Sequence, residues 1–251
     1  MTDRQEDSSP AANRKRIISR LAGFAELDPP EIERLLTFEG PTSEFARGDI
    51  IRSEGERELY LLLDGWAASA VVLADGSRQL ITANLPGDLL GLPGLAMEEP
   101  IDTVVALTPA KVIHISQPQL GALFANSPRL AAIMFLISQE ERSLLMERLA
   151  LTGQASALTN LAALILRLYE RNGQVDDAPT ASFFMPLTQR ELGELIGVSS
   201  VHTNSLIKKL RTDGVVSIAN RTLTIEDKPR LFQIAGISPW RRSRPGWLQV
   251  I

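Results

Sequence analysis

Side chains with hydroxyl, amide, imidazole and basic groups follow one another closely between Thr188 and Lys209. Hydroxyl, amide and imidazole groups hydrogen bond to base edges, and arginine and lysine bind phosphates, so this set has the chemistry of duplex DNA recognition. For His202, a DNA contact and a solvent-facing position without a role are equally compatible with the sequence. The candidate DNA-binding residues are Thr188, Gln189, Arg190, Ser199, Ser200, His202, Thr203, Asn204, Ser205, Lys208 and Lys209.

Other chemistries find few suitable residues in this chain. Cysteine is absent, which excludes disulfides, iron–sulfur clusters and thiolate zinc sites, and the two histidines, His114 and His202, are too few for a histidine metal cluster. The sequence also lacks a serine elbow, a phosphate loop and any metal-ligand spacing. We therefore expect no enzymatic activity, no cofactor and no metal.

The charge is distributed unevenly along the chain. The formal net charge of −4 argues weakly against DNA binding, but from Phe183 onward ten arginine and lysine residues stand against five acidic residues. A local positive field is what phosphate binding requires, so the C-terminal part is suited to a polyanionic partner.

Two short helices are predicted to position the candidate residues. Thr188 and Glu191 have the spacing of a capping box, Gly197 supplies a turn, and Ser199 caps a second helix that ends near Asp213. The apolar residues of these helices, expected on their inner faces, are Leu192, Leu195, Ile196, Val201, Leu206, Ile207 and Leu210.

A close crossing and a hairpin complete the predicted motif. Gly193 and Thr203 are small enough to let the two helices approach, and Asn220-Arg221 joins two short apolar runs as a wing. Together these features predict a winged helix-turn-helix rather than an ordinary helical hairpin.

The N-terminal half has a different pattern, in which short apolar segments alternate with glycine and aspartate turns. Asp64-Gly65 and Asp75-Gly76 are strong hairpin signals, so an antiparallel roll is expected and the fold class is α+β. The predicted strands are Asp49–Ile51, Glu58–Leu63, Ala67–Leu73, Gln79–Ala83, Val104–Leu107 and Lys111–Ile115.

A long helix is predicted between Ser127 and Leu151. Residues at alternating spacings of four and three form a stripe of the kind found in coiled coils, with a second apolar flank beside it. We expect one face to pack on the roll and the stripe to form a homodimer. The predicted dimerisation residues are Leu130, Met134, Ile137, Glu141, Leu144 and Arg148.

These elements suggest five consecutive regions. They are a flexible N-terminus at 1–16, a roll at 17–126, a dimerisation helix at 127–152, a winged helix-turn-helix at 153–227 and a tail at 228–251. The tail contains Trp240, Arg241, Arg242, Arg244 and Trp247. Two interpretations of the tail remain open: it contacts DNA or a partner, or it is a mobile or self-packed extension.

The order of these parts resembles that of the Crp/Fnr transcription regulators, from about Ile17 to Ile225. The roll is similar in the turns at Arg47–Ile51, Glu54-Gly55, Leu59–Gly65 and Pro86–Gly91, and the DNA-binding motif in Leu187–Leu210. The resemblance implies a sequence-specific regulator that binds palindromic operators as a homodimer, with RNA polymerase as a partner.

The effector site departs from the pattern of the cyclic-AMP-binding members of that family. Their Gly-Glu pair is replaced by Gly91-Leu92, and Asp102-Thr103 stands where they carry an Arg-Ser or Arg-Thr pair, with no arginine between Pro93 and Val105. A cyclic phosphate would lie beside Asp102 without a cation, so we expect a degenerate pocket whose effector is not a cyclic nucleotide. His114 lies in a predicted strand, which favours packing over haem ligation.

The sequence contains no visible signal peptide and no apolar run of membrane-spanning length, so a cytoplasmic protein without membrane association is expected. Two alternatives remain open at this point. One is a small-ligand-binding regulatory module without a direct role at DNA, and the other is a scaffold dimer. The effector ligand is unknown.

Overall fold

The computed structural model describes residues 17–37, 39–172 and 181–250. The predicted flexible N-terminus, residues 1–16, lies outside these ranges. The described chain falls into two compact units. The first comprises the described residues within Met1–Val72, Thr82–Glu140 and Arg242–Ile251, and the second comprises those within Leu73–Ile81 and Glu141–Arg241.

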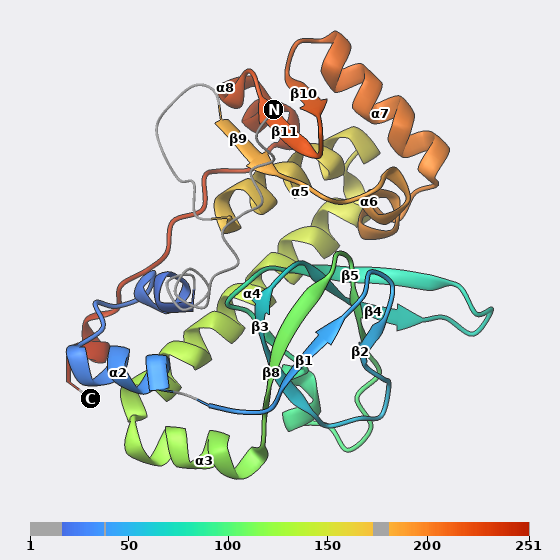
Figure 1. The fold of residues 1–251 in the computed structure, drawn as a ribbon. Helices are drawn as coiled ribbons and strands as arrows, with labels where there is room; N and C mark the ends of the chain where they lie inside the picture. The colour runs from blue at the N-terminus through green and yellow to red at the C-terminus, as the bar shows by residue number, and fades with distance from the viewer. Residues whose placement is uncertain (1–16, 38, 173–180, 251) are drawn as a thin grey trace. The chain divides into compact units, whose positions relative to one another are not determined.

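Antiparallel strands form the predicted roll (Figure 1). They make two four-stranded sheets, of order β1-β8-β3-β6 and β2-β7-β4-β5. The six predicted strands are confirmed, whereas β1 and β6 were not predicted. The strands are β1 Thr42–Phe45, β2 Ile50–Arg52, β3 Leu59–Asp64, β4 Ala67–Val72, β5 Arg78–Asn84, β6 Leu89–Leu90, β7 Thr103–Ala106 and β8 Ala110–Ile115.

Helices cover the apolar side of this roll. The helical residues 17–22, α2 (Pro29–Thr37), α3 (Gln117–Asn126) and the first part of α4 (Pro128–Gln154) accompany the short 3-10 turn η1 (Leu92–Leu95). A core cluster joins them to β3 and β8, and its buried members include Leu21, Leu59, Ile115, Leu130 and Ile137.

The second unit is built around α5 (Ala157–Arg171), whose buried residues Leu161, Ile165 and Leu166 face its neighbours. The elements that follow are β9 Ala181–Phe184, α6 Gln189–Ile196, α7 Ser200–Thr212, β10 Val216–Ala219, β11 Thr222–Ile225 and α8 Lys228–Ala235. The strands form one sheet of order β10-β11-β9. The 3-10 turn η2 (Gly246–Gln249) follows in the C-terminal residues that belong to the first unit.

Among the described residues, no single helix has the length and apolar composition of a membrane span. The pair Gln117–Asn126 and Pro128–Gly153 passes that test only jointly, with a bend of 116° between its two helices. The α+β class, the roll, the long helix and the winged helix-turn-helix are all as predicted.

Candidate nucleic-acid interface

The first helix of the motif, α6, begins as its sequence predicts. The Thr188 hydroxyl accepts a hydrogen bond from the Glu191 amide at 3.2 Å, and the Glu191 carboxylate accepts one from the Thr188 amide at 2.7 Å. This capping box satisfies amides that have no partner within the helix. Gly197 ends α6 in the left-handed region, with φ of 75°.

The two helices cross as closely as the sequence analysis predicts. A Cβ atom on Gly193 would lie 2.6 Å from the Val198 carbonyl oxygen and 2.8 Å from the Thr203 hydroxyl. Thr203 is fully buried, and its hydroxyl donates to the Ser199 carbonyl oxygen at 3.0 Å. The inclusion of Thr203 among the DNA-binding residues is therefore wrong, because this side chain packs at the crossing.

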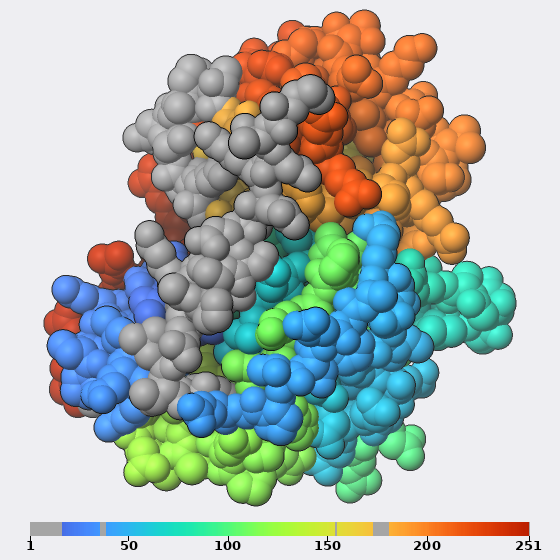
Figure 2. Space-filling model, viewed as in Figure 1, coloured from blue at the N-terminus to red at the C-terminus, as the bar shows by residue number. Residues whose placement is uncertain are grey.

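The second helix, α7, presents a polar face to solvent. Ser199 caps it by accepting a hydrogen bond from the His202 amide at 3.2 Å, so this hydroxyl has a structural task at the helix start. Helix α7 lies at the surface in Figure 2, where it is coloured orange. The exposed residues of the face are Ser200, Val201, His202, Asn204, Ser205, Lys208 and Lys209. The predicted base-reading and phosphate-binding positions of α7 are thus accessible, Thr203 excepted.

The predicted position of Val201 is also wrong, because this residue is exposed and not buried. It was predicted on the inner face, but its side chain is 79% exposed. The buried positions of α7 are Thr203, Ile207 and Leu210, which recur at helical spacing, and Val201 falls outside that stripe. An exposed valine methyl is suited to contact with the thymine methyl group, so α7 offers one apolar contact that the sequence analysis missed.

Gln189 and Asn204 are brought together across the two helices. The Gln189 side-chain amide donates to Asn204 Oδ1 at 3.1 Å, although the residues lie fifteen positions apart. The Asn204 Nδ2 group then remains as a donor on the exposed face.

A groove of about 730 Å³ lies between the start of α6, α7 and the hairpin of β10 and β11. Its apolar floor includes Leu192 and Ile207, and its polar lining includes Lys208. Arg211 and Arg221 also line this groove, although neither was among the predicted DNA-binding residues. The basic excess after Phe183 was the signal that could have included them.

The wing is confirmed, and its turn has the expected conformation. Asn220 and Arg221 have φ of 49° and 59°, the left-handed pair that a two-residue hairpin turn of type I′ requires. The additional strand β9 pairs with β11, so the wing is anchored to a third strand that the sequence analysis did not predict.

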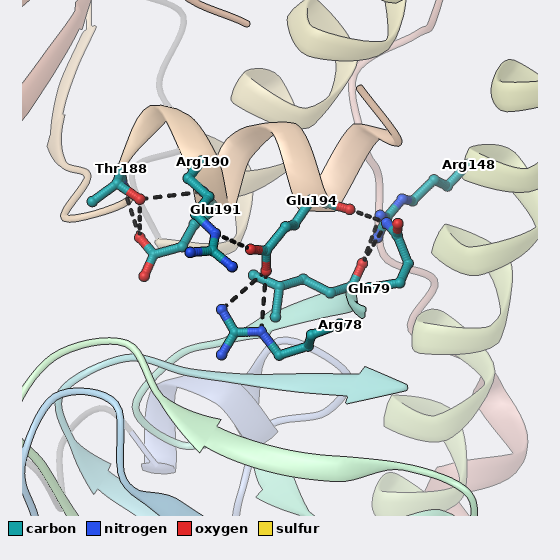
Figure 3. Close-up of polar contacts among 8 residues, drawn as sticks. Arg78, Gln79, Arg148, Thr188, Arg190, Glu191 and Glu194 are labelled. Atoms are coloured by element: carbon teal, nitrogen blue, oxygen red, sulfur yellow. Dashed lines mark hydrogen bonds and ion pairs between the residues drawn. The ribbon is translucent and has the colours of Figure 1, made fainter. Parts of the chain in front are cut away.

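Arg190 is tied to α6 by an ion pair within the second unit (Figure 3). Glu194 accepts from Arg190 Nε at 2.9 Å and from Arg78 Nη2 at 3.0 Å, and the Gln79 side chain donates to the Glu194 carbonyl oxygen. The Arg190 side chain is still 78% exposed, so it remains accessible to a phosphate.

The predicted effector site of the roll is occupied by an internal ion pair. Arg52, from β2, is fully buried and approaches Asp102 Oδ1 with its Nη2 at 2.6 Å. Its Nη2 also donates to the Asp102 carbonyl oxygen at 2.9 Å, and a Cβ on Gly91 would lie 3.1 Å from its Cδ. A cation is therefore present beside Asp102, which corrects the expectation of none, but its charge is already paired.

The other two residues of the predicted pocket have packing roles. Leu92 packs against the core cluster of the first unit, and Thr103 begins β7, opposite Ala70 in the sheet. Neither observation assigns a ligand. His114 pairs with Glu58, and the centroid of its ring lies 5.4 Å from that of Tyr60. Both contacts agree with the packing interpretation of this histidine.

Most residues of the predicted dimer stripe of α4 pack against other parts of the same chain. Leu130 and Ile137 are buried in the core of the first unit, and Met134 packs against it, so the prediction is wrong for Leu130 and Ile137. Arg148 donates to the Leu80 carbonyl oxygen at 3.2 Å and to that of Ile81, and burial lowers its pKa to about 10. Glu141 and Leu144 are half-buried.

The comparisons with known proteins agree with this architecture. Residues 42–127 match the model of a cyclic nucleotide-binding domain, and residues 160–234 match that of a Crp-like helix-turn-helix domain. The fumarate and nitrate reduction regulatory protein of Vibrio cholerae is 26% identical over 85% of this chain and 84% of its own. The transcriptional regulatory protein btr of Bordetella pertussis is 24% identical over 65% of this chain and 67% of its own.

A solved structure supports the fold in particular. FixK2 from Bradyrhizobium japonicum superimposes with a TM-score of 0.69 over 80% of this chain and all of its own, at 19% sequence identity. The two curated relatives are named as regulatory proteins, which agrees with the expectation that the protein is not an enzyme. With both domain matches in this order and the predicted helix-turn-helix in place, the chain belongs to the Crp/Fnr family of DNA-binding transcription regulators.

Proposed function

We propose that this protein binds a palindromic operator as a homodimer and that its effector is not a cyclic nucleotide. The observation that carries the proposal is the capped helix α7, whose polar face is exposed beside a basic groove. An exposed helix of this kind, beginning at a cap and followed by a wing, has the geometry for insertion into the major groove.

The base-reading part of the face is the first half of α7. Ser200, His202, Asn204 and Ser205 are exposed there, and the N-terminal end of a recognition helix meets base edges. Because Asn204 Oδ1 accepts from Gln189, the Nδ2 group is the atom left to read a base acceptor. This arrangement favours donation to a purine N7 or to a carbonyl oxygen over a bidentate contact to adenine.

The phosphate-binding part surrounds the groove. Lys208, Arg211 and Arg221 supply positive charge from α7 and the wing. Thr188 and Gln189 stand at the start of α6, where main-chain amides and the positive end of the helix dipole favour an anion. Such contacts set affinity and register, while the contacts of α7 set sequence preference.

The dimer contact is assigned to a different face of α4 from the predicted one. Phe135, Met146 and Leu149 are 57%, 59% and 75% exposed, and with Arg142 they recur at spacings of seven, four and three. This repeat is the seam of a coiled coil. A second copy of the same helix is the partner that such a self-complementary apolar stripe fits.

The internal ion pair supports the effector part of the proposal. A cyclic phosphate entering near Gly91 would compete with Asp102 for the Arg52 guanidinium, and removing one partner from a buried pair is costly. Contact with RNA polymerase and a cytoplasmic location complete the proposal, since both are expected of a bacterial-type transcription regulator.

Selection of operators from random duplexes tests the proposal. The protein is expected to enrich a sequence with two-fold symmetry, with half-sites about one helical turn apart. Cyclic AMP and cyclic GMP are expected to leave its affinity unchanged. The absence of any enriched sequence would instead favour a regulatory module without a direct role at DNA.

Substitutions on this face of α4 test the dimer. The double substitution Met146→Lys and Leu149→Lys is expected to give monomers in sedimentation and to abolish operator binding, because each new lysine would be buried against its copy across the seam. Met97→Lys with Ile101→Lys is the matched control, since both residues are exposed in the roll. Dimers in the first variant, or monomers in the second, would contradict the assigned face.

A further inference from the structure

The segment that follows α8, residues 237–250, is held by contacts at both of its ends. We call it the C-terminal strap. It lies beyond residues 160–234, which match the helix-turn-helix domain, so the DNA-binding motif is complete without it. Of the two interpretations left open by the sequence, the structure favours packing on the chain itself.

The first end of the strap is anchored within the second unit at Trp240. Its amide donates to Glu170 Oε1 at 2.7 Å, and the Arg167 guanidinium lies over its ring at 5.1 Å. Arg167 also donates to the Ser238 carbonyl oxygen at 3.2 Å and pairs with Glu170 at 2.6 Å. A cation over an indole and a charged hydrogen-bond acceptor are both favourable contacts, so this end has a defined position on α5.

The second end is anchored within the first unit at Arg242. Its Nε donates to Glu140 Oε1 at 2.6 Å, and its guanidinium lies 5.6 Å from the Phe24 ring centroid. Burial raises the pKa of Glu140, but the charges of Arg20 and Arg242 outweigh burial, so its pKa lies below its ordinary value. The buried carboxylate is thus kept ionised by two arginines, one of which comes from the strap.

Leu248 then inserts into the core of the first unit. Its side chain is 1% exposed and belongs to the same cluster as Leu21, Phe24 and Leu130. Arg129 secures the main chain at this point, donating from Nε to the Leu248 carbonyl oxygen at 3.1 Å. A fully buried leucine is a substantial anchor, so the last turn of the strap forms part of this core.

The two residues of the Glu140–Arg242 ion pair flank the whole chain segment 141–241. That segment contains α5, the helix-turn-helix and the wing, and its two ends are brought together by the pair. A contact that closes so long a loop removes conformational freedom that the open chain would have.

We propose that the Glu140–Arg242 pair and the buried Leu248 form a clasp that holds the C-terminus on the first unit and restrains the DNA-reading segment at both of its ends. The clasp needs no ligand, because every group in it comes from this chain.

Hydrogen exchange at the amides of residues 246–250 measures the clasp directly. In the full-length protein these amides are expected to be protected. Arg242→Ala is expected to speed their exchange about tenfold or more, because a hydrogen bond to a buried charge is lost. Arg244→Ala is the matched control, since it removes the same charge from an exposed position of the strap.

Leu248→Ala provides a second route to the same result. It leaves both arginines in place and removes the apolar anchor, so faster exchange in this variant is also expected. Unprotected amides in the unmodified protein, or equal exchange rates in Arg242→Ala and Arg244→Ala, would overturn the clasp.

A second measurement tests restraint of the DNA-reading segment, and it rests on the proposed function. With an operator selected by the unmodified protein, Arg242→Ala is expected to raise the dissociation constant about threefold or more, since a less restrained segment loses more freedom on binding. Unchanged affinity with increased exchange would refute the restraint but leave the proposed function standing. Failure to select any operator would refute the proposed function, while the exchange measurement would still decide whether the clasp exists.

Discussion

The helix-turn-helix and the effector site of the roll both contain basic side chains, but they use them in opposite ways. In the helix-turn-helix, Lys208, Arg211 and Arg221 line an open groove. In the roll, Arg52 is fully buried and paired with Asp102. The same class of charge is available to an external phosphate in one region and is neutralised internally in the other.

The difference teaches that a count of basic residues does not locate an anion site. An attraction between unit charges strengthens as the surroundings become less polar, so the buried Asp102 carboxylate only a few ångströms away neutralises the Arg52 guanidinium. Exposure and pairing decide which arginine is free to bind.

The largest effect is expected from breaking the internal pair. Asp102→Ala leaves Arg52 buried without its carboxylate, and we expect a loss of about 3–5 kcal/mol in the free energy of unfolding, measured by urea titration. Sulfate should then raise the melting temperature of this variant more than that of the unmodified protein, because an anion site has been opened.

Glu99→Ala is the control for that experiment, since it removes the same charge from an exposed residue of the same segment. Equal stability of the two variants would show that the pair does not hold the roll together. The contrast between a closed and an open basic region would then lose its physical basis.

A smaller effect is expected from disturbing the crossing of α6 and α7. In Gly193→Ala the new methyl group meets the Val198 carbonyl oxygen and the Thr203 hydroxyl, so we expect a loss of about 3 kcal/mol in unfolding free energy and weaker operator binding. Calorimetry and gel shifts measure the two effects.

Gly121→Ala in α3 is the matched control, because nothing lies within 4 Å of a Cβ at that position. A helical alanine there should stabilise the protein by about 0.5–1 kcal/mol. If Gly193→Ala were as harmless, the helices would have to cross less closely than the structure shows.

The smallest effects separate base reading from phosphate binding. Asn204→Ala is expected to reduce the preference for the operator over random duplex by about 0.5–1.5 kcal/mol, as expected for the loss of one hydrogen bond to a base. Lys208→Ala should weaken binding to both duplexes about equally. It should also reduce the slope of the logarithm of the binding constant against the logarithm of salt concentration by about one. Titrations at several salt concentrations measure both. Equal weakening by Asn204→Ala, with altered specificity in Lys208→Ala, would reverse the assigned roles.

Local features of the fold were predictable because their partners lie within a few residues. Thr188 and Glu191 cap α6 across three positions, and Asn220-Arg221 form a turn that only two residues define. The roll was predictable for the same reason, since its hairpins begin at glycine turns. The strands β1 and β6 escaped prediction because β1 has little apolar content and β6 is two residues long.

The orientation of helix faces was predicted less well. Val201 is apolar and was assigned inward, yet the stripe that faces α6 runs through Thr203, Ile207 and Leu210. A threonine was buried in preference to a valine because Gly193 leaves space opposite it. Residue type therefore misplaced Val201, whereas the small size of Thr203 had correctly placed it at the crossing, and only its inclusion among the DNA-binding residues was wrong.

The sequence by itself determined the capped helices, the wing, the hairpins of the roll and the chemistry of the DNA-reading residues, since short-range contacts specify each of them. Only the tertiary structure decided which apolar flank of α4 is buried, because the stripe through Leu130 and Ile137 and the stripe through Phe135 and Leu149 have the same helical periodicity. It also decided that Arg52 meets Asp102, fifty positions later. Such contacts join elements far apart in the chain, and no local pattern records them.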